Sequence, residues 1–175
     1  MAVWEPGRSV VLIGPPTAGK SSVGELLAAA LGVPFADTDT LVADAAHKPV
    51  SDIFVDDGEL VFRELERAAV ARGLDAVKSA GGVLALGSGA VLDLDVRRML
   101  AGQVVVYLEA EFATVAKRTG MDRPRVVIPG NPRGRLRSML EERRPVYADL
   151  ATVTVATDDM AAEEVAADLA KRLRA

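Results

Sequence analysis

The first pattern with chemical potential is a loop with the spacing G-x-x-x-x-G-K-S, which follows the apolar run Val10–Ile13. In such a loop the glycines let backbone N–H groups turn toward a phosphate, Lys20 reaches the β- and γ-oxygens, and the Ser21 hydroxyl binds Mg²⁺. A helix start at this point directs its positive end at the same anion. The sequence therefore predicts a nucleotide-binding loop made by Gly14, Thr17, Ala18, Gly19, Lys20, Ser21 and Ser22.

Two carboxylates, Asp37 and Asp39, follow the next apolar run. Their i, i+2 spacing places both side chains on one side if the backbone stays extended. Mg²⁺ in nucleotide sites keeps several waters and few protein ligands, so one carboxylate beside Ser21 could bind the metal while the other meets a substrate. Alternatively, the acidic residues only cap the next helix. We favour the functional role, because a phosphate loop precedes the pair.

Two further patterns have both a structural and a functional interpretation. Arg63 lies in an acidic stretch, where it could bind a carboxylate in bidentate fashion, but its spacing favours an i, i+3 ion pair with Glu66. The Gly-Ser-Gly turn at 87–89 could expose backbone N–H groups to a ligand, or its glycines could serve a tight turn with positive φ. From the residues alone we favour the ion pair, and both interpretations of the turn stay open.

Arginines gather late in the chain, at Arg118, Arg123, Arg125 and Arg143. The segment 119–134, which includes Arg123 and Arg125, is rich in glycine, proline and arginine. This composition predicts a mobile lid. Cations placed at a transferring phosphoryl group stabilise its charge, and a closing lid excludes water. The alternative is a solvated basic loop.

Short apolar runs alternate with longer stretches of helical spacing. The runs predict five strands, at Val10–Ile13, Pro34–Ala36, Val83–Leu86, Val104–Leu108 and Thr152–Val155. The helical stretches are Ser21–Leu31, Asp57–Arg72, Asp93–Ala101, Glu111–Thr119, Gly134–Leu150 and Met160–Arg174. This alternation predicts an α/β protein with three layers (α/β/α) and a five-stranded parallel sheet. Ligands of such sheets bind beyond the carboxyl ends of the strands.

Length and composition limit the function further. The 175 residues, half of them apolar, fit one domain over 1–175. A net charge of −4 and a pI near 5.1 argue against binding to nucleic acid. The absence of cysteine and the single His47 exclude thiolate and histidine-cluster metal sites. The first residues lack the pattern of a secretion signal, and no uncharged apolar run reaches membrane-spanning length. We expect a cytoplasmic, monomeric enzyme with a small-molecule substrate and no membrane partner.

The order of these patterns resembles that of shikimate kinases, small P-loop kinases, over nearly the whole chain. The resemblance implies ATP-dependent phosphorylation of shikimate to shikimate 3-phosphate. It also implies that Mg²⁺ lies at Ser21 and Asp37, while Asp39 binds substrate hydroxyls. Lys20, Asp39 and Arg123 would be the catalytic residues, with Arg123 as the lid arginine that reaches the transferring phosphate.

The acceptor residues also follow from this resemblance. The family's Asp-Gly-Glu-x-x-Phe-Arg-x-x-Glu pattern matches 57–66. The resemblance therefore implies that Arg63 binds the shikimate carboxylate, and it overturns the interpretation of Arg63 as only an ion-pair partner of Glu66. The pattern Arg-x-Pro-x-Tyr at 143–147 implies that Arg143 is a second carboxylate-binding arginine, and Arg118 resembles the residue near adenine. Within a substrate-binding helical segment at 37–66, Phe54 and Phe62 would wall the ring pocket. The implied acceptor contacts are Asp39, Arg63, Gly87, Ser88, Gly89 and Arg143.

The chain departs from the family pattern at two places. Thr17 and Ala18 stand where the family usually has a glycine and a small hydroxyl residue, and Ser88 stands within a turn that usually has three glycines. The Ser88 side chain could point away from the pocket, narrow it, or recognise a different ring substituent. A kinase for a related acidic cyclitol or sugar acid, of the aminoshikimate or gluconate type, is therefore the first alternative. A non-catalytic nucleotide-binding regulatory protein is the second.

Overall fold

A five-stranded parallel sheet forms the centre of the protein. The computed structural model describes residues 4–5, 7–122 and 130–175. The strand order is β2-β3-β1-β4-β5, and all four strand pairs are parallel. The strands are β1 Val10–Ile13, β2 Phe35–Asp37, β3 Val83–Ala85, β4 Val104–Glu109 and β5 Val153–Ala156. The predicted strands are confirmed to within one residue at each end. β2 begins after Pro34, which has no N–H group to donate to a neighbouring strand.

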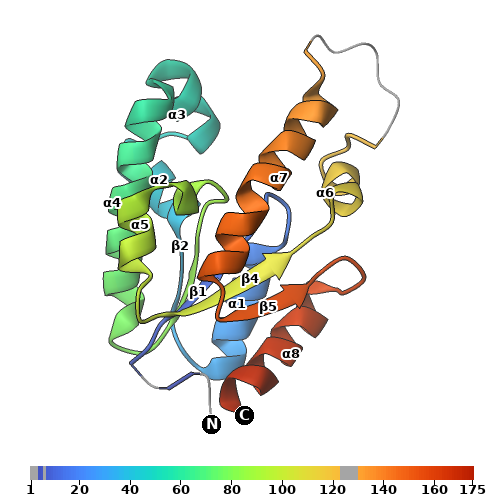
Figure 1. Ribbon diagram of the computed structural model, residues 1–175. Coiled ribbons are helices and arrows are strands. Elements are labelled where there is room, and N and C mark those ends of the chain that lie inside the picture. The colour runs from blue at the N-terminus through green and yellow to red at the C-terminus, as the bar shows by residue number, and fades with distance from the viewer. Residues whose placement is uncertain (1–3, 6, 123–129) are drawn as a thin grey trace.

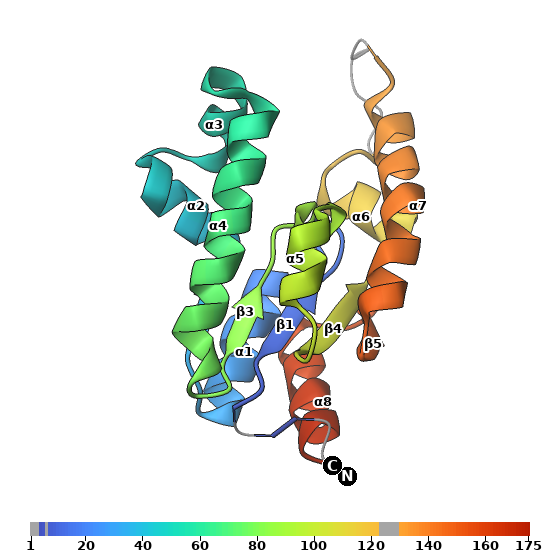
Figure 2. The ribbon, with the colours of Figure 1, turned by 60° about the vertical axis from the view of Figure 1, so that its left-hand side comes forward.

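Helices cover both faces of this sheet. They are α1 Lys20–Leu31, α2 Thr38–Ala46, α3 Val50–Asp56, α4 Gly58–Lys78, the 3₁₀ turn η1 Ala90–Leu92, α5 Leu94–Met99, α6 Phe112–Arg118, α7 Pro132–Leu150 and α8 Ala162–Arg174. Figures 1 and 2 show α1 and α8 on one face of the sheet and α4 and α5 on the other. The three-layer α/β/α prediction is therefore confirmed.

The alternation of side chains along β1 explains the two helical layers. Val10 and Leu12 belong to a core cluster with α1 and α8, whereas Val11 and Ile13 belong to a second cluster with α4 and α5. All four side chains are at most 1% exposed. A strand buried on both faces reads as a continuous apolar run, as this one does. The β1 strand therefore fixes the position of the phosphate loop that follows it.

The helical region at 37–66 is more divided than its sequence predicted. Two short helices, α2 and α3, precede α4 and were not predicted as separate elements. They pack on α4 through a third apolar cluster of Val42, Ile53, Phe62 and Ala69, away from the sheet. α4 also continues to Lys78, six residues past its predicted end, because Leu74 and Val77 extend its buried face.

Part of the predicted lid at 119–134 lies outside the described residues. α6 ends at Arg118 and α7 begins at Pro132, while residues 123–129, with Arg123 and Arg125, are not described. The lid and the role of Arg123 stay predictions. Within the described part of the chain, no helix combines the length and apolar character needed to cross a membrane.

Candidate functional site

The phosphate loop lies between β1 and α1, and its shape requires glycine at both ends. Gly14 has φ +149°, and a Cβ there would lie 2.5 Å from the carbonyl oxygen of Leu108. Gly19 has φ +92° and is the N-cap residue of α1. Between them Thr17 also has a positive φ, +63°, which a β-branched residue adopts at a steric cost. Positive φ at 17 accounts for the glycine that the family usually has in this part of the loop.

Lys20 lies inside this loop. Its Nζ donates to the carbonyl oxygens of Gly14 at 2.9 Å and Pro15 at 2.8 Å. Loss of hydration lowers the pKa of Lys20 to about 8, although Asp39 and Asp37 favour its charged form. The amine is thus held at the centre of the loop, where a phosphate would lie.

The two carboxylates meet the loop at the end of β2. The Ser21 hydroxyl donates to Asp37 Oδ2 at 2.5 Å, and Asp37 Oδ1 accepts the backbone N–H of Asp39 at 2.9 Å. The premise of an extended backbone was wrong, because α2 begins at Thr38 with Asp37 as its N-cap residue. Asp37 therefore caps a helix and also contacts the loop serine. The capping interpretation is confirmed for this residue, and its role in binding a metal stays a prediction.

The Asp39 side chain is exposed at the surface of the site, but neighbouring groups remove part of the water around its carboxylate. Desolvation raises its pKa, and the neighbouring Asp37 raises it further, whereas Lys20 lowers it. The carboxyl therefore holds its proton more tightly than an ordinary aspartate does. A raised pKa of this kind suits a group that exchanges a proton with a substrate hydroxyl.

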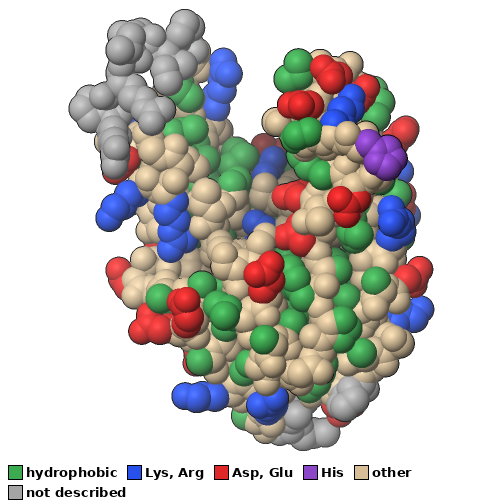
Figure 3. Space-filling view, turned by 180° about the vertical axis from the view of Figure 1, so that it is seen from behind, with side chains coloured by type: hydrophobic (Ala, Val, Ile, Leu, Met, Phe, Trp, Pro, Cys, Tyr) green, Lys and Arg blue, Asp and Glu red, His purple; other side chains and the backbone are tan. Residues whose placement is uncertain are grey.

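Two adjoining cavities divide the site. The first, the loop cavity, has a volume of about 370 Å³ and is lined by Pro16, Thr17, Gly19, Lys20, Ser21, Ser22, Asp37, Asp39, Leu86 and Ser88. The second, the arginine cavity, has a volume of about 270 Å³ and is lined by Asp39, Val50, Phe54, Phe62, Arg63, Glu66, Gly87, Ser88, Gly89, Met139 and Arg143. Asp39 and Ser88 line both. All the predicted acceptor residues therefore line the arginine cavity. The cavity lies in the hollow between α3 and α7, which is open to solvent in Figure 3.

Arg63 is both ion-paired and part of the arginine cavity. Its Nη1 contacts Glu66 Oε2 at 2.6 Å, and its Nη2 lies 3.5 Å from Glu59 Oε1. Glu66 is only 2% exposed, and this burial raises its pKa against the influence of Arg63. The expected i, i+3 pair therefore exists, but it is a partly buried pair at the cavity wall. Sequence reasoning missed the burial of Glu66, which sets this pair apart from a surface pair.

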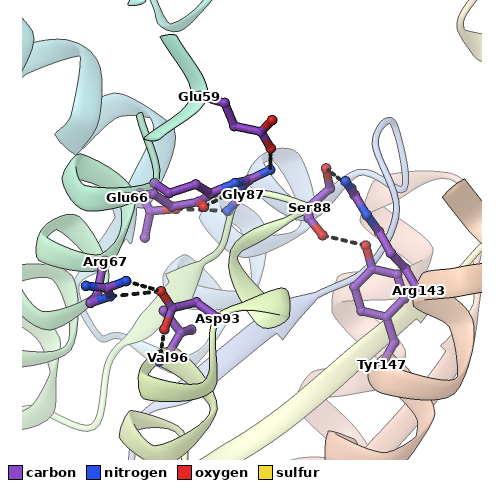
Figure 4. A network of polar contacts seen from close by, with 11 residues as sticks. Glu59, Glu66, Arg67, Gly87, Ser88, Asp93, Val96, Arg143 and Tyr147 are labelled. Carbon is purple, nitrogen blue, oxygen red and sulfur yellow. Dashed lines mark hydrogen bonds and ion pairs between the residues drawn. The ribbon is translucent and has the colours of Figure 1, made fainter. Parts of the chain in front are cut away.

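Arg143 reaches the same cavity from α7 and is held differently. Its Nη1 donates to the Ser88 hydroxyl at 3.3 Å (Figure 4). Among the residues that the structure describes, no carboxylate forms an ion pair with Arg143. Tyr147, one turn further along α7, donates its hydroxyl to the Ser88 carbonyl oxygen at 2.6 Å. Burial raises the pKa of Tyr147 to about 12, so this hydroxyl stays a donor.

The glycines of the 87–89 turn are explained by close approach and not by φ. Neither Gly87 nor Gly89 has a positive φ, so that interpretation of the turn was wrong. A Cβ on Gly87 would lie 2.8 Å from Glu66 Oε1, and a Cβ on Gly89 would lie 2.7 Å from Arg63 Nη1. The side chains of Glu66 and Arg63 therefore lie directly against the backbone of this turn.

Arg118 lies apart from these two cavities. Its guanidinium donates to the carbonyl oxygens of Thr17 at 2.9 Å and Thr157 at 3.0 Å. It lines a third cavity of about 500 Å³ with Thr114, Lys117, Asp122, Asp158 and Asp159. The arginine thus ties the phosphate loop to the end of β5, and its predicted contact with adenine stays a prediction.

Comparisons with known proteins agree with this geometry. A family model described as shikimate kinase matches residues 16–174. The chain belongs to the shikimate kinase family. The shikimate kinase of Thermobifida fusca is 53% identical to it over 165 residues, with 94% of each chain covered. That of Salinispora arenicola is 49% identical over 165 residues, covering 94% of this chain and 97% of the relative.

A solved structure of this family extends the agreement to the fold. The shikimate kinase from Acinetobacter baumannii in complex with shikimate has a TM-score of 0.81 and 33% sequence identity to this chain. The match covers 93% of this chain and 90% of that one. The family resemblance inferred from the motifs is therefore confirmed, and it makes the protein an ATP-dependent kinase.

The residues around Ser21 fit the metal that such a kinase implies. Mg²⁺ prefers oxygen ligands and takes one or two from the protein, together with water and phosphate oxygens. The Ser21 hydroxyl and the Asp37 carboxylate supply such oxygens at the wall of the loop cavity. The donor set therefore suits Mg²⁺ beside a bound nucleotide.

Sequence reasoning gave no role to two residues that shape the site, although one of them, Tyr147, ends the pattern at 143–147. Thr38, which is fully buried, accepts the N–H of Gly87 at 2.9 Å, and Tyr147 holds the carbonyl oxygen of the next residue. Both act on the backbone of the turn from other elements. No local pattern reveals such contacts, because the partners lie 49 and 59 positions apart in the sequence.

Proposed function

We propose that this protein transfers the γ-phosphoryl group of ATP to a ring hydroxyl of shikimate, giving shikimate 3-phosphate. Family membership supports this reaction, and the strongest support from the site is the arrangement of its two cavities. The loop cavity and the arginine cavity adjoin, and Asp39 lines both. A nucleotide phosphate in the first cavity and an acid in the second would meet at this carboxylate.

The loop cavity would hold the nucleotide. Lys20 and the loop N–H groups bind the β- and γ-phosphates, and Ser21 and Asp37 hold Mg²⁺. The metal, when bound, neutralises charge on the phosphate oxygens. Arg118, which donates to the Thr17 carbonyl oxygen, would lie beside the nucleoside, as the family resemblance implies. Arg123 would add a cation at the transferring group, as the family resemblance implies.

The arginine cavity would hold the acceptor by its carboxylate. Arg143 forms no ion pair with a carboxylate of the described residues, so its charge is available to an anionic ligand. Arg63 adds a second guanidinium, and Phe54 and Phe62 add an apolar wall with ring centroids 4.2 Å apart. Asp39 then orients the attacking hydroxyl and accepts its proton. Two guanidinium groups in one cavity favour an acidic acceptor over a neutral cyclitol.

The test is ADP release by the purified protein with ATP and Mg²⁺, with and without shikimate, and with gluconate and a neutral cyclitol in parallel. We expect release that depends on shikimate. Release with gluconate or the cyclitol alone would make the protein a different sugar kinase. Nucleotide binding without any acceptor-dependent release would favour the regulatory alternative.

Two substitutions on α7 sharpen the assignment of the acceptor site. Loss of a hydrogen-bonded charge costs about 1.5–3 kcal/mol, so we expect Arg143→Ala to raise the KM for shikimate roughly 10- to 100-fold with the KM for ATP nearly unchanged. Arg144→Ala is the matched control, because Arg144 points to Glu111 at 3.4 Å and lines neither cavity. Equal KM values for both variants would contradict the role of Arg143.

A further inference from the structure

The turn 87–89 lies between α4 and α7, and only its middle residue has room for a side chain. A Cβ on Gly87 would meet Glu66 and Asp39 at 2.8 and 2.9 Å, and one on Gly89 would meet Arg63 at 2.7 Å. Ser88 instead faces α7, where its half-buried side chain contacts Arg143. Figure 4 shows this arrangement, with Glu66 on one side of the turn and Arg143 on the other.

The backbone of the turn is held without help from the Ser88 hydroxyl. Tyr147 donates to the carbonyl oxygen of Ser88 at 2.6 Å, and the N–H of Gly87 donates to Thr38 Oγ1 at 2.9 Å. Both bonds involve main-chain atoms of the turn, so they persist whatever side chain stands at position 88. The hydroxyl is therefore free for another role, and it accepts a hydrogen bond from Arg143 Nη1 at 3.3 Å.

The two arginines of the cavity are fixed by different chemistry. The charge of Arg63 is balanced by Glu66 and Glu59, at 2.6 and 3.5 Å. Arg143 is instead contacted by neutral hydroxyls, that of Ser88 at 3.3 Å and that of Tyr147. An arginine side chain loses about 2 kcal/mol of rotamer entropy when it is fixed, and a partner that fixes it beforehand removes part of that cost from ligand binding. A hydroxyl can do this without neutralising the charge that an anion needs.

We propose that Ser88 is a positioning residue: its hydroxyl holds the guanidinium of Arg143 in the arginine cavity, ready for the carboxylate of the acceptor. This inference rests on the proposed function of the cavity. Under this proposal the Ser88 hydroxyl acts through Arg143 and does not recognise a different ring substituent. The residue that departs from the family's three-glycine turn thereby strengthens binding of the acid.

The test combines Ser88→Ala with Arg143→Ala in a double-mutant cycle. One hydrogen bond contributes about 0.5–1.5 kcal/mol, so we expect Ser88→Ala to raise the KM for shikimate about two- to tenfold. kcat and the KM for ATP should change less than twofold. In the Arg143→Ala background, Ser88→Ala should have no further effect. Ser138→Ala, at an exposed serine of α7, is the control and should leave every constant unchanged.

Three results would overturn the proposal. The first is an unchanged KM in Ser88→Ala. The second is an equal rise of KM with and without Arg143, which would mean that the hydroxyl contacts the acid itself. The third is a fall of kcat and of the melting temperature in Ser88→Ala, which would mean a structural role.

A second measurement does not depend on which acid is the acceptor. In protein with ¹⁵N-labelled arginine, a held guanidinium rotates slowly and gives resolved Nη–H signals. We expect one such set to disappear in Arg143→Lys, which assigns it, and to become averaged in Ser88→Ala. Resolved signals that persist in Ser88→Ala would overturn the proposal. Absence of shikimate-dependent ADP release in the unaltered protein would instead overturn the proposed function, so the two failures are distinguishable.

Discussion

At the scale of single residues, Lys20 should make nucleotide binding sensitive to alkaline pH. Its pKa is lowered to about 8, because burial in the loop removes water from the amine. A bound triphosphate raises this pKa again, so binding takes up a proton wherever the free protein has lost it. We expect full affinity below pH 8 and a fall that approaches tenfold per pH unit above it. Calorimetry from pH 7.5 to 9.5 in buffers of different ionisation enthalpy measures both the affinity and the proton uptake.

The control for this pH effect is Lys20→Arg. An arginine at position 20 keeps its charge over the whole range, so its affinity for the nucleotide, whatever its value, should not fall between pH 7.5 and 9.5. A parallel fall in both proteins, or binding to the unaltered protein without proton uptake at pH 9.5, would contradict the role of Lys20.

The chemical role of a residue was predictable from the sequence only where the residue belongs to a local motif. Lys20, Ser21 and Asp37 follow from the spacing of the loop and of the acidic pair. The positive φ of Thr17 and the close contacts of Gly87 do not, because they arise from the path of the backbone and from atoms of distant elements. The bond between Ser88 and Arg143 belongs to the same class, since its partners lie 55 positions apart in the sequence.

At the scale of elements, apolar periodicity predicted the sheet and most helices. It missed α2 and α3 because helices of nine and seven residues are too short to show a repeating apolar face, and they pack on a small separate cluster. It also ended α4 before Gly73, although the helix continues. Gly73 lies where α4 crosses β3, and a Cβ there would be 2.6 Å from Leu84 Cδ1. A glycine inside a helix can thus mark close packing as well as a helix end, and the sequence alone does not distinguish the two.

The same kind of contact predicts the effect of a substitution in α1. A Cβ on Gly24 would lie 2.4 Å from Phe35 Cε2 and 3.2 Å from Leu12 Cδ1. We therefore expect Gly24→Ala to lower the free energy of unfolding by about 1–3 kcal/mol, although alanine is the better helix former. Urea denaturation followed by circular dichroism measures this change.

Glu25→Ala is the matched control for that experiment, because Glu25 occupies the exposed face of the same helix. We expect its effect to stay within about 0.5 kcal/mol. A Gly24→Ala protein as stable as the control would show that α1 can move away from β2 without loss.

At the scale of the whole molecule, both ends of the described chain join one core. The backbone N–H of Trp4 donates to the Leu173 carbonyl oxygen at 3.1 Å, and its indole donates to the Gly81 carbonyl oxygen at 3.1 Å. Leu173 is fully buried against the layer that α1 and α8 form over the sheet. The first described residues, the entry to β3 and the last helix are thereby linked. We infer that the chain unfolds as a single cooperative unit.

Leu173→Ala tests this inference. Removal of a buried leucine side chain costs about 2–5 kcal/mol, whereas Leu94→Ala, at a leucine that is 62% exposed, should cost less than about 0.5 kcal/mol. Trp4 is the only tryptophan, so its fluorescence reports on the junction of the termini while circular dichroism reports on all helices. One cooperative unit requires that Leu173→Ala shift both transitions together and by the same amount. A fluorescence transition that moves alone would mean that the junction unfolds separately, and that the sheet with its two cavities is stable without α8.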